Sequence, residues 1–179
     1  NNSLNDGQRS CRIVLTGGPG GGKTTAGDLL RRELGDEVVM VPEAATLLFS
    51  GGFPRHTDAL AVRAAQRAIF QVQRGLEDTQ SANFSDRILL CDRGTVDGQA
   101  YWPLMGDRDD DFFAAQGTTL AREFSRYDAV LFFETAAAGE ISIDSNNPVR
   151  TENLEQAREL DAKLHTIWGQ HSRFVFIPH

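Results

Sequence analysis

The chain has 179 residues, enough to bury one hydrophobic core but too few for two substantial ones, so we expect a single domain. With 40% hydrophobic and 24% charged residues, the composition is that of a folded globular protein and excludes a disordered or fibrous chain. The formal net charge of -7 argues against a nucleic-acid partner, and no apolar run approaches the length of a membrane span.

Residues 1–10 are polar and lack both the charged start and the apolar core of a signal peptide. We therefore expect a flexible N-terminal tail over residues 1–10, a single domain over residues 11–179, and a cytoplasmic protein.

Five short apolar runs recur along the chain. Each is continuous rather than alternating, which is typical of strands that are buried on both faces of a parallel sheet. The predicted strands are residues 12–16, 37–41, 87–91, 129–133 and 173–177.

Helical patterns fill the gaps between these runs. They predict helices over residues 24–34, over 57–80 with Thr57 as a plausible N-terminal cap, and over 154–168. This alternation of strand and helix indicates an α/β fold with a doubly wound parallel sheet.

Cys11 and Cys91 would lie at opposite ends of neighbouring strands, roughly 13–16 Å apart at about 3.3 Å per residue. A disulfide requires Cα atoms within about 7 Å, so we expect two free thiols. The four histidines show no metal-binding spacing, and no zinc site is expected.

Polar residues follow each predicted strand, at the sheet edge where ligands bind in such folds. The first strand leads into "GGPGGGKTT", the second into Pro42-Glu43, the third into Asp92-Arg93 and the fourth into Glu134-Thr135. We expect these segments to form one site.

The glycine-rich segment fits the Walker A pattern, since Gly17 is followed after four residues by Gly22-Lys23-Thr24 between a strand and a helix. Its backbone N–H groups would surround phosphate, Lys23 would reach the β- and γ-phosphates, and Thr24 would bind Mg²⁺. The alternative is a glycine-rich turn with an incidental lysine. The predicted phosphate-binding residues are Gly17, Gly18, Pro19, Gly20, Gly21, Gly22, Lys23, Thr24 and Thr25.

Asp92 ends the third strand, where a Walker B carboxylate holds magnesium. Its alternative role is to cap the N-terminus of a following helix. We predict that Thr24 and Asp92 share the metal ion.

Several segments resemble the P-loop nucleoside and nucleotide kinases. "CDRGTVDGQAYW" looks like their Asp/Glu-Arg motif, "VPEAA" is similar to their second-strand segment, and "RTENLEQARELDAKLHTIW" is similar to the arginine-bearing lid and following helix of deoxynucleoside kinases. The whole chain resembles most the small AAA-type ATP-binding proteins grouped with the nicotinamide-riboside kinase domain of bifunctional NAD regulators. The resemblance implies a three-layer P-loop NTPase fold with strand order 2-3-1-4-5. It also implies ATP with Mg²⁺ as cofactor, GTP being possible, and a small-molecule phosphoryl acceptor.

The resemblance implies roles for two residues at the strand ends. Glu43 would be the general base on an acceptor hydroxyl, or only a carboxylate that stabilises a helix N-terminus. Arg93 would clamp the acceptor or a transferring phosphoryl oxygen. Asp97 either takes part in this clamp or only holds Arg93.

A lid is expected over residues 135–150, and Arg150 would close from it over the phosphates as a catalytic arginine. The related lids usually carry more than one arginine, whereas this segment has one, with Arg158 a distant second. The alternative is a solvated Arg150 that pairs with Glu152 or Glu155.

One face of the predicted long helix could contact the acceptor, because its members recur at three- and four-residue spacings. An ordinary solvated face is the alternative. Tyr101 and Trp102 would either wall an acceptor pocket or belong to the core. The "DRDDD" run at 107–111 is expected to be a solvated loop. The predicted substrate-facing residues are Arg63, Gln66, Arg67, Phe70 and Tyr101, with Glu43 and Arg93; Gln73 shares the helix face.

Two functions fit these residues: an ATP-dependent small-molecule kinase, and a nucleotide-bound switch or slow NTPase that signals to a protein partner. A motor of the AAA type is disfavoured, because Asp92 is followed by arginine rather than by a glutamate that activates water. An enclosed acceptor cavity of ~300 Å³ or more between Glu43, Arg93 and Gln66 would favour the kinase. Either a monomer or a homodimer is compatible with the sequence.

Overall fold

The computed structural model describes residues 10–108, 110–138 and 148–179, with the side chains of residues 138 and 148–153 excepted. The expected tail therefore lies, apart from residue 10, outside the described residues, as do residues 139–147 of the expected lid.

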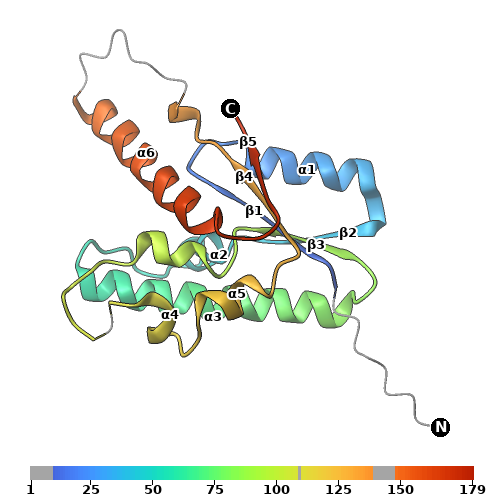
Figure 1. Ribbon diagram of the computed structural model, residues 1–179, viewed down its shortest axis with the longest axis horizontal. Coiled ribbons are helices and arrows are strands. Elements are labelled where there is room, and N and C mark those ends of the chain that lie inside the picture. The colour runs from blue at the N-terminus through green and yellow to red at the C-terminus, as the bar shows by residue number, and fades with distance from the viewer. Residues whose placement is uncertain (1–9, 109, 139–147) are drawn as a thin grey trace.

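Five parallel strands form one sheet in the order β2-β3-β1-β4-β5 (Figure 1), which confirms the expected P-loop NTPase fold and strand order. In the central register, Leu15 of β1 lies opposite Asp92 of β3 and Leu131 of β4. The strands are β1 (Arg12–Gly17), β2 (Val38–Val41), β3 (Ile88–Asp92), β4 (Ala129–Phe133) and β5 (Phe174–Ile177).

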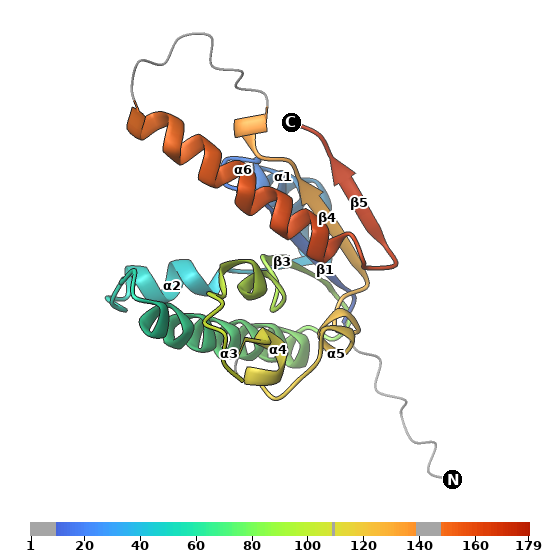
Figure 2. The same ribbon diagram turned by 60° about the vertical axis from the view of Figure 1, so that its left-hand side comes forward.

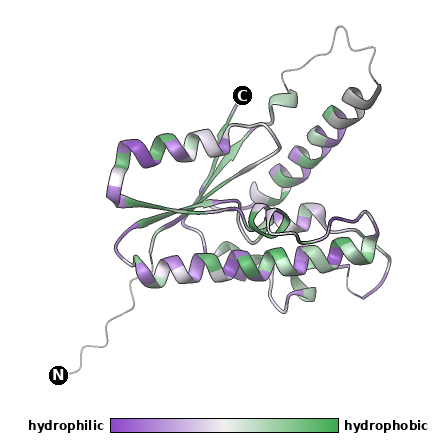
Figure 3. Ribbon diagram, turned by 180° about the vertical axis from the view of Figure 1, so that it is seen from behind, coloured by the Kyte–Doolittle hydropathy of each residue, from purple (hydrophilic) through white to green (hydrophobic). Residues whose placement is uncertain are grey.

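Helices cover both faces of the sheet (Figures 1 and 2). Helix α1 (Lys23–Leu34) packs on one face against β1, β2 and β3. Helices α3 (Ala59–Asn83) and α6 (Pro148–Trp168) pack on the other, α3 against β2 and β3 and α6 against β1 and β4. The strands are mainly apolar while the helices carry both apolar and polar residues (Figure 3), as three layers require.

Short elements complete the chain. They are η1 (Gly35–Glu37), α2 (Ala44–Ser50), η2 (Asp97–Tyr101), α4 (Phe112–Ala115), α5 (Leu120–Phe124) and η3 (Ala136–Ala138). Helix α2, which directly follows Glu43, was not predicted.

Two predicted helix starts were wrong. The cap of α3 is Asp58 rather than Thr57, because the Asp58 carboxylate accepts hydrogen bonds from the N–H groups of Leu60 and Ala61. Helix α6 begins at Pro148, before the predicted residue 154, and proline is favoured in a first helical turn because its missing N–H has no partner there.

The core lies between the sheet and the α3/α6 layer and is rich in aromatic side chains. Phe112 makes edge-to-face contacts with Phe70, Trp102 and Phe113. Cys91 is buried in this core and Cys11 is exposed, and no disulfide joins them, as predicted. No helix within the described ranges is long and apolar enough to cross a bilayer.

Candidate functional site

The glycine-rich loop joins β1 to α1 and ends with Gly22 at the helix N-cap, in a left-handed conformation with φ 80°. Lys23 is the first helical residue. Its ammonium Nζ donates to the carbonyl oxygens of Gly17 at 3.1 Å and Gly18 at 2.7 Å, so it is held within the loop. Burial lowers the pKa of Lys23 below its ordinary value, and the nearby Arg93 guanidinium lowers it further.

The glycines of this loop serve two purposes. At Gly17 and Gly21 a Cβ atom would lie 2.0 and 2.9 Å from the Phe133 carbonyl oxygen, so these residues let the loop pass the end of β4. At Gly22 a Cβ atom would meet nothing within 4 Å, and glycine is needed there only for its positive φ. The glycine cluster therefore reflects packing as well as the open cradle that phosphate would enter.

Two residues that hold the loop were missed as site residues. Asp161 of α6 accepts hydrogen bonds at one oxygen from the N–H groups of Gly18 at 2.7 Å and Thr135 at 3.1 Å. Thr135 donates its hydroxyl to the Pro19 carbonyl at 2.6 Å. Thr135 was visible as a polar residue after the fourth strand, but nothing in the sequence links Asp161 to a loop 143 residues away.

Asp92 and Thr24 have the donor groups of a magnesium site. Burial raises the pKa of the half-buried Asp92 carboxyl, and Glu43 raises it further. Asp92 caps no helix, since Val96 is the N-cap of the following η2, so the capping alternative was wrong. Within the described part of the chain, no three or more Asp, Glu, His or Cys residues are arranged so that they could hold a metal ion. Thr24 and Thr25 are exposed at the start of α1.

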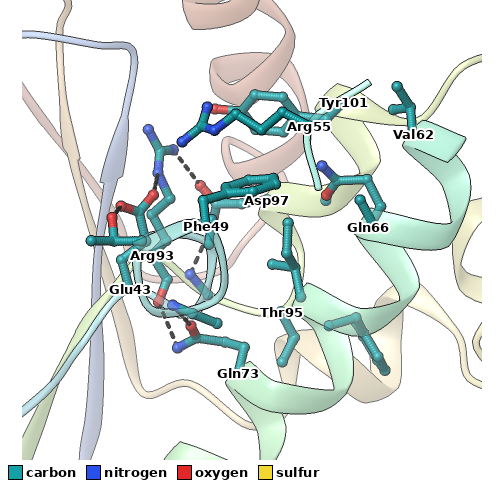
Figure 4. A pocket seen from close by; sticks show the side chains of 18 of the residues that line it. Glu43, Phe49, Arg55, Val62, Gln66, Gln73, Arg93, Thr95, Asp97 and Tyr101 are labelled. Atoms are coloured by element: carbon teal, nitrogen blue, oxygen red, sulfur yellow. Dashed lines mark hydrogen bonds and ion pairs between the residues drawn. The ribbon is translucent and has the colours of Figure 1, made fainter. Parts of the chain in front are cut away.

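Glu43 and Arg93 meet beside the loop (Figure 4). Arg93 Nε donates to Glu43 Oε1 at 2.8 Å, and its Nη1 donates to the Gly17 carbonyl oxygen at 3.3 Å. Arg93 has φ 67°, a left-handed conformation that is costly for a residue with a side chain and that clusters at functional sites. One arginine thus connects the expected general base to the phosphate-binding loop.

Asp97 holds this arginine in place. Its Oδ1 accepts from Arg93 Nη1 at 2.9 Å and Thr16 Oγ1 at 2.6 Å. Its Oδ2 accepts from the Gly94 N–H at 2.9 Å and Trp168 Nε1 at 3.2 Å. Because each oxygen of this buried carboxylate already accepts two hydrogen bonds within the protein, the structure favours the holding role over direct participation.

A cavity of about 380 Å³ opens between α2, α3 and η2, with Glu43 and Arg93 in its wall. It is lined by five of the predicted substrate-facing residues: Glu43, Gln66, Phe70, Arg93 and Tyr101. Burial raises the pKa of the Tyr101 hydroxyl, although the nearby Arg93 guanidinium opposes this shift. The long helix therefore contributes Gln66 and Phe70 to a pocket rather than to a solvated face.

Arg63 was predicted to contact substrate, and this was wrong. Its buried guanidinium forms ion pairs with Asp107 at 2.9 Å and Asp110 at 2.5 Å, and it donates to the Pro103 carbonyl oxygen. The arginine thus holds Pro103, Asp107 and Asp110 against α3. The acidic run is consequently no simple solvated loop, and Asp111 in it caps α4.

Arg67 and Trp102 also lie outside the cavity lining. Arg67 is exposed, with its guanidinium 5.5 Å from the centre of the Trp102 ring. Trp102 itself is buried in the core. The side chain of the proposed lid residue Arg150 lies outside the described residues, so its role stays a prediction.

The cavity lining also contains residues that were not predicted. Arg55 lies 4.0 Å above the ring of Phe49, and His56 follows it. These residues belong to α2 and the loop after it, and no periodic pattern indicated that this segment would face the strand ends.

A sequence profile of the AAA domain family matches residues 12–178. The chain belongs to the AAA domain family. Among solved structures, this AAA domain resembles thymidylate kinase from Ehrlichia chaffeensis with a TM-score of 0.55 and 18% sequence identity, over 95% of this chain and 89% of that one. This likeness shows the fold. A comparison with curated protein sequences gives no match.

Proposed function

We propose that this AAA domain is a small-molecule kinase that transfers the γ-phosphoryl group of Mg-ATP to a nucleoside-like or nucleotide-like acceptor. The observation that carries the proposal is the position of the Glu43–Arg93 pair. Both residues line the 380 Å³ cavity, and Arg93 also bonds to the Gly17 carbonyl of the loop. A switch requires no such acceptor cavity beside the phosphate cradle.

On the donor side, the loop amides and Lys23 would bind the phosphates of ATP, and Thr24 and Asp92 would hold magnesium. Mg-ATP supplies the phosphoryl group and the metal charge that stabilises it. Lys23 is already directed into the loop by its bonds to Gly17 and Gly18. These side chains support Mg-ATP as the cofactor.

On the acceptor side, Glu43 would accept the proton of the attacking hydroxyl and Arg93 would orient the transferring group. The Arg93 contact fixes one oxygen of Glu43, while Thr46 donates its hydroxyl to the other at 2.5 Å. These two contacts hold the carboxylate in one orientation toward the cavity, as proton transfer requires.

The cavity walls suit a flat polar ring. Phe49, Phe70 and Tyr101 supply aromatic surface, and the Gln66 amide lines the same cavity with both a donor and an acceptor group. A volume of 380 Å³ lies in the usual range for small-molecule sites. The fold shared with a thymidylate kinase supports a nucleoside-like or nucleotide-like ring.

The test is ADP release from Mg-ATP, screened over nucleosides, nucleoside monophosphates and nicotinamide riboside. An acceptor should stimulate the wild type, and Glu43→Gln should lower kcat by about 10²–10⁴-fold with little change in KM for ATP. Glu37→Gln, at an exposed glutamate outside the cavity, is the matched control. If no acceptor stimulates the wild type, and Glu43→Gln hydrolyses ATP as slowly as the wild type does, the chain is not this kinase.

A further inference from the structure

Gln73 lines the cavity and contacts the backbone next to Glu43 and that of Arg93 (Figure 4). Its side chain is buried on α3, with 2% of the residue exposed. Its Oε1 accepts from the N–H of Ala44 at 3.2 Å, and its Nε2 donates to the carbonyl oxygen of Arg93 at 3.2 Å. A single amide therefore joins the residue after Glu43 to Arg93 itself.

The contact with Ala44 fixes the start of α2, directly after Glu43. Glu43 is the N-cap of α2, a position whose side chain normally accepts a hydrogen bond from the N–H of the second or third helical residue. Here the Glu43 side chain makes no such bond, and Gln73 accepts from the N–H of the first helical residue, Ala44. The Glu43 carboxylate instead accepts from Arg93 and Thr46 and lines the cavity.

The contact with Arg93 stabilises an unfavourable backbone conformation. Arg93 is the one residue other than glycine with a positive φ in the described part of the chain. Its N–H donates to the Leu15 carbonyl oxygen at 2.9 Å, and its own carbonyl accepts from Gln73. These two bonds fix both sides of the strained turn that aims the guanidinium at Glu43 and Gly17.

Glu77 determines which way the Gln73 amide faces. Gln73 Nε2 also donates to Glu77 Oε1 at 3.2 Å, and that carboxylate is fully buried. Tyr127 donates to the same oxygen at 2.7 Å, and Arg126 donates to the other at 2.9 Å. Because a carboxylate only accepts, the amide nitrogen must face it, which leaves the amide oxygen for Ala44.

We propose that Gln73 is a positioning residue for phosphoryl transfer: through its contacts with the Ala44 N–H and the Arg93 carbonyl it sets the relative placement of Glu43 and Arg93. The expected effect on kcat rests on the proposed kinase function, whereas the effect on the Glu43–Arg93 contact does not.

Gln73→Met removes both contacts while keeping the length and most of the volume of the side chain. Gln71→Met, at an exposed glutamine on the same helix and outside the cavity lining, is the matched control. Gln73→Asn is the second variant, because it keeps a polar amide beside Glu77 but withdraws it by one methylene from Ala44 and Arg93.

Two measurements are made on each folded variant. Hydrogen exchange of the Arg93 Nε–H, followed by NMR, reports its bond to Glu43 without any catalysis. It should become at least about tenfold faster in both Gln73 variants and stay unchanged in Gln71→Met. Steady-state kinetics should show kcat about 10–100-fold lower with an unchanged KM for ATP, as expected for a small misplacement of reacting groups. A residue that only stabilised the fold would lower the melting temperature and leave both values unchanged.

The proposal is overturned if a folded Gln73 variant retains the wild-type exchange of Arg93, or if an active wild type and this variant have the same kcat. If exchange accelerates but no acceptor stimulates the wild type, the kinase function fails and the positioning of Glu43 and Arg93 by Gln73 stands.

Discussion

Because Gly17 is closely packed and Gly22 is not, we expect replacement by alanine to destabilise the fold by different amounts at the two positions. In Gly17→Ala, the new Cβ atom would lie 2.0 Å from the Phe133 carbonyl oxygen, in the middle of the sheet. In Gly22→Ala, the new Cβ atom would meet nothing within 4 Å. The first substitution therefore tests packing, and the second tests only the cost of a positive φ.

The structure sets the size of each effect. Gly22 has φ 80°, and a left-handed alanine costs roughly 1–2 kcal/mol, which lowers Tm by about 2–8 °C for a domain of this size. Gly17 has φ 128°, and the separation of its Cβ from Phe133 would have to open from 2.0 to at least 3.0 Å, between two hydrogen-bonded strands. We expect about 4 kcal/mol or more from this clash and strain together, a large share of the roughly 5–15 kcal/mol that stabilises a typical domain.

Urea unfolding followed by tryptophan fluorescence measures both effects, because Trp168 and Trp102 are buried. Gly22→Ala should remain folded, so its affinity for Mg-ADP is measurable by calorimetry. We expect that affinity to fall by about tenfold as the strained loop turns an amide away from the phosphates. Equal destabilisation by the two substitutions would refute the assignment of Gly17 to close packing. Unchanged ADP affinity in Gly22→Ala would refute the role of this turn in phosphate binding.

Three further outcomes are expected. Asp161→Ala releases two backbone amides at the loop and should weaken Mg-ADP binding several-fold in calorimetry, whereas Glu159→Ala, at an exposed residue of the same helix, should not. Burial raises the pKa of the Glu77 carboxyl above 4.5, so the folded state binds a proton there more tightly than the unfolded state does. The free energy of unfolding should therefore fall as pH rises from 4.5 through the raised pKa. Urea titrations at several pH values should show this fall in the wild type but not in Glu77→Gln. Arg63→Ala should make residues 103–110 susceptible to limited proteolysis while leaving Mg-ADP affinity unchanged, and equal cleavage rates in variant and wild type would contradict the anchoring role of Arg63.

Local patterns in the sequence determined the strands, the parallel architecture and the phosphate-binding loop. A continuous apolar run predicts a buried strand wherever it occurs, and the glycine and lysine spacing before a helix is a local requirement of the loop itself. Glu43, Asp92 and Arg93 were found for a related reason, since each lies at the end of a strand or within two residues of it, and these strand ends must reach the same sheet edge. The strand order came from the family resemblance.

Only the tertiary structure decided what the residues of α3 do. Helical periodicity places four residues of α3 on one face, yet their roles differ: Arg63, Gln66, Phe70 and Gln73. Arg63 anchors the segment that contains Asp107 and Asp110. The other three line the cavity, and Gln73 in addition contacts the backbone beneath Glu43 and Arg93. The physical reason is length: a helix of 25 residues spans about 37 Å, so a single face passes several unrelated segments, and which segment meets which turn depends on contacts far apart in the chain.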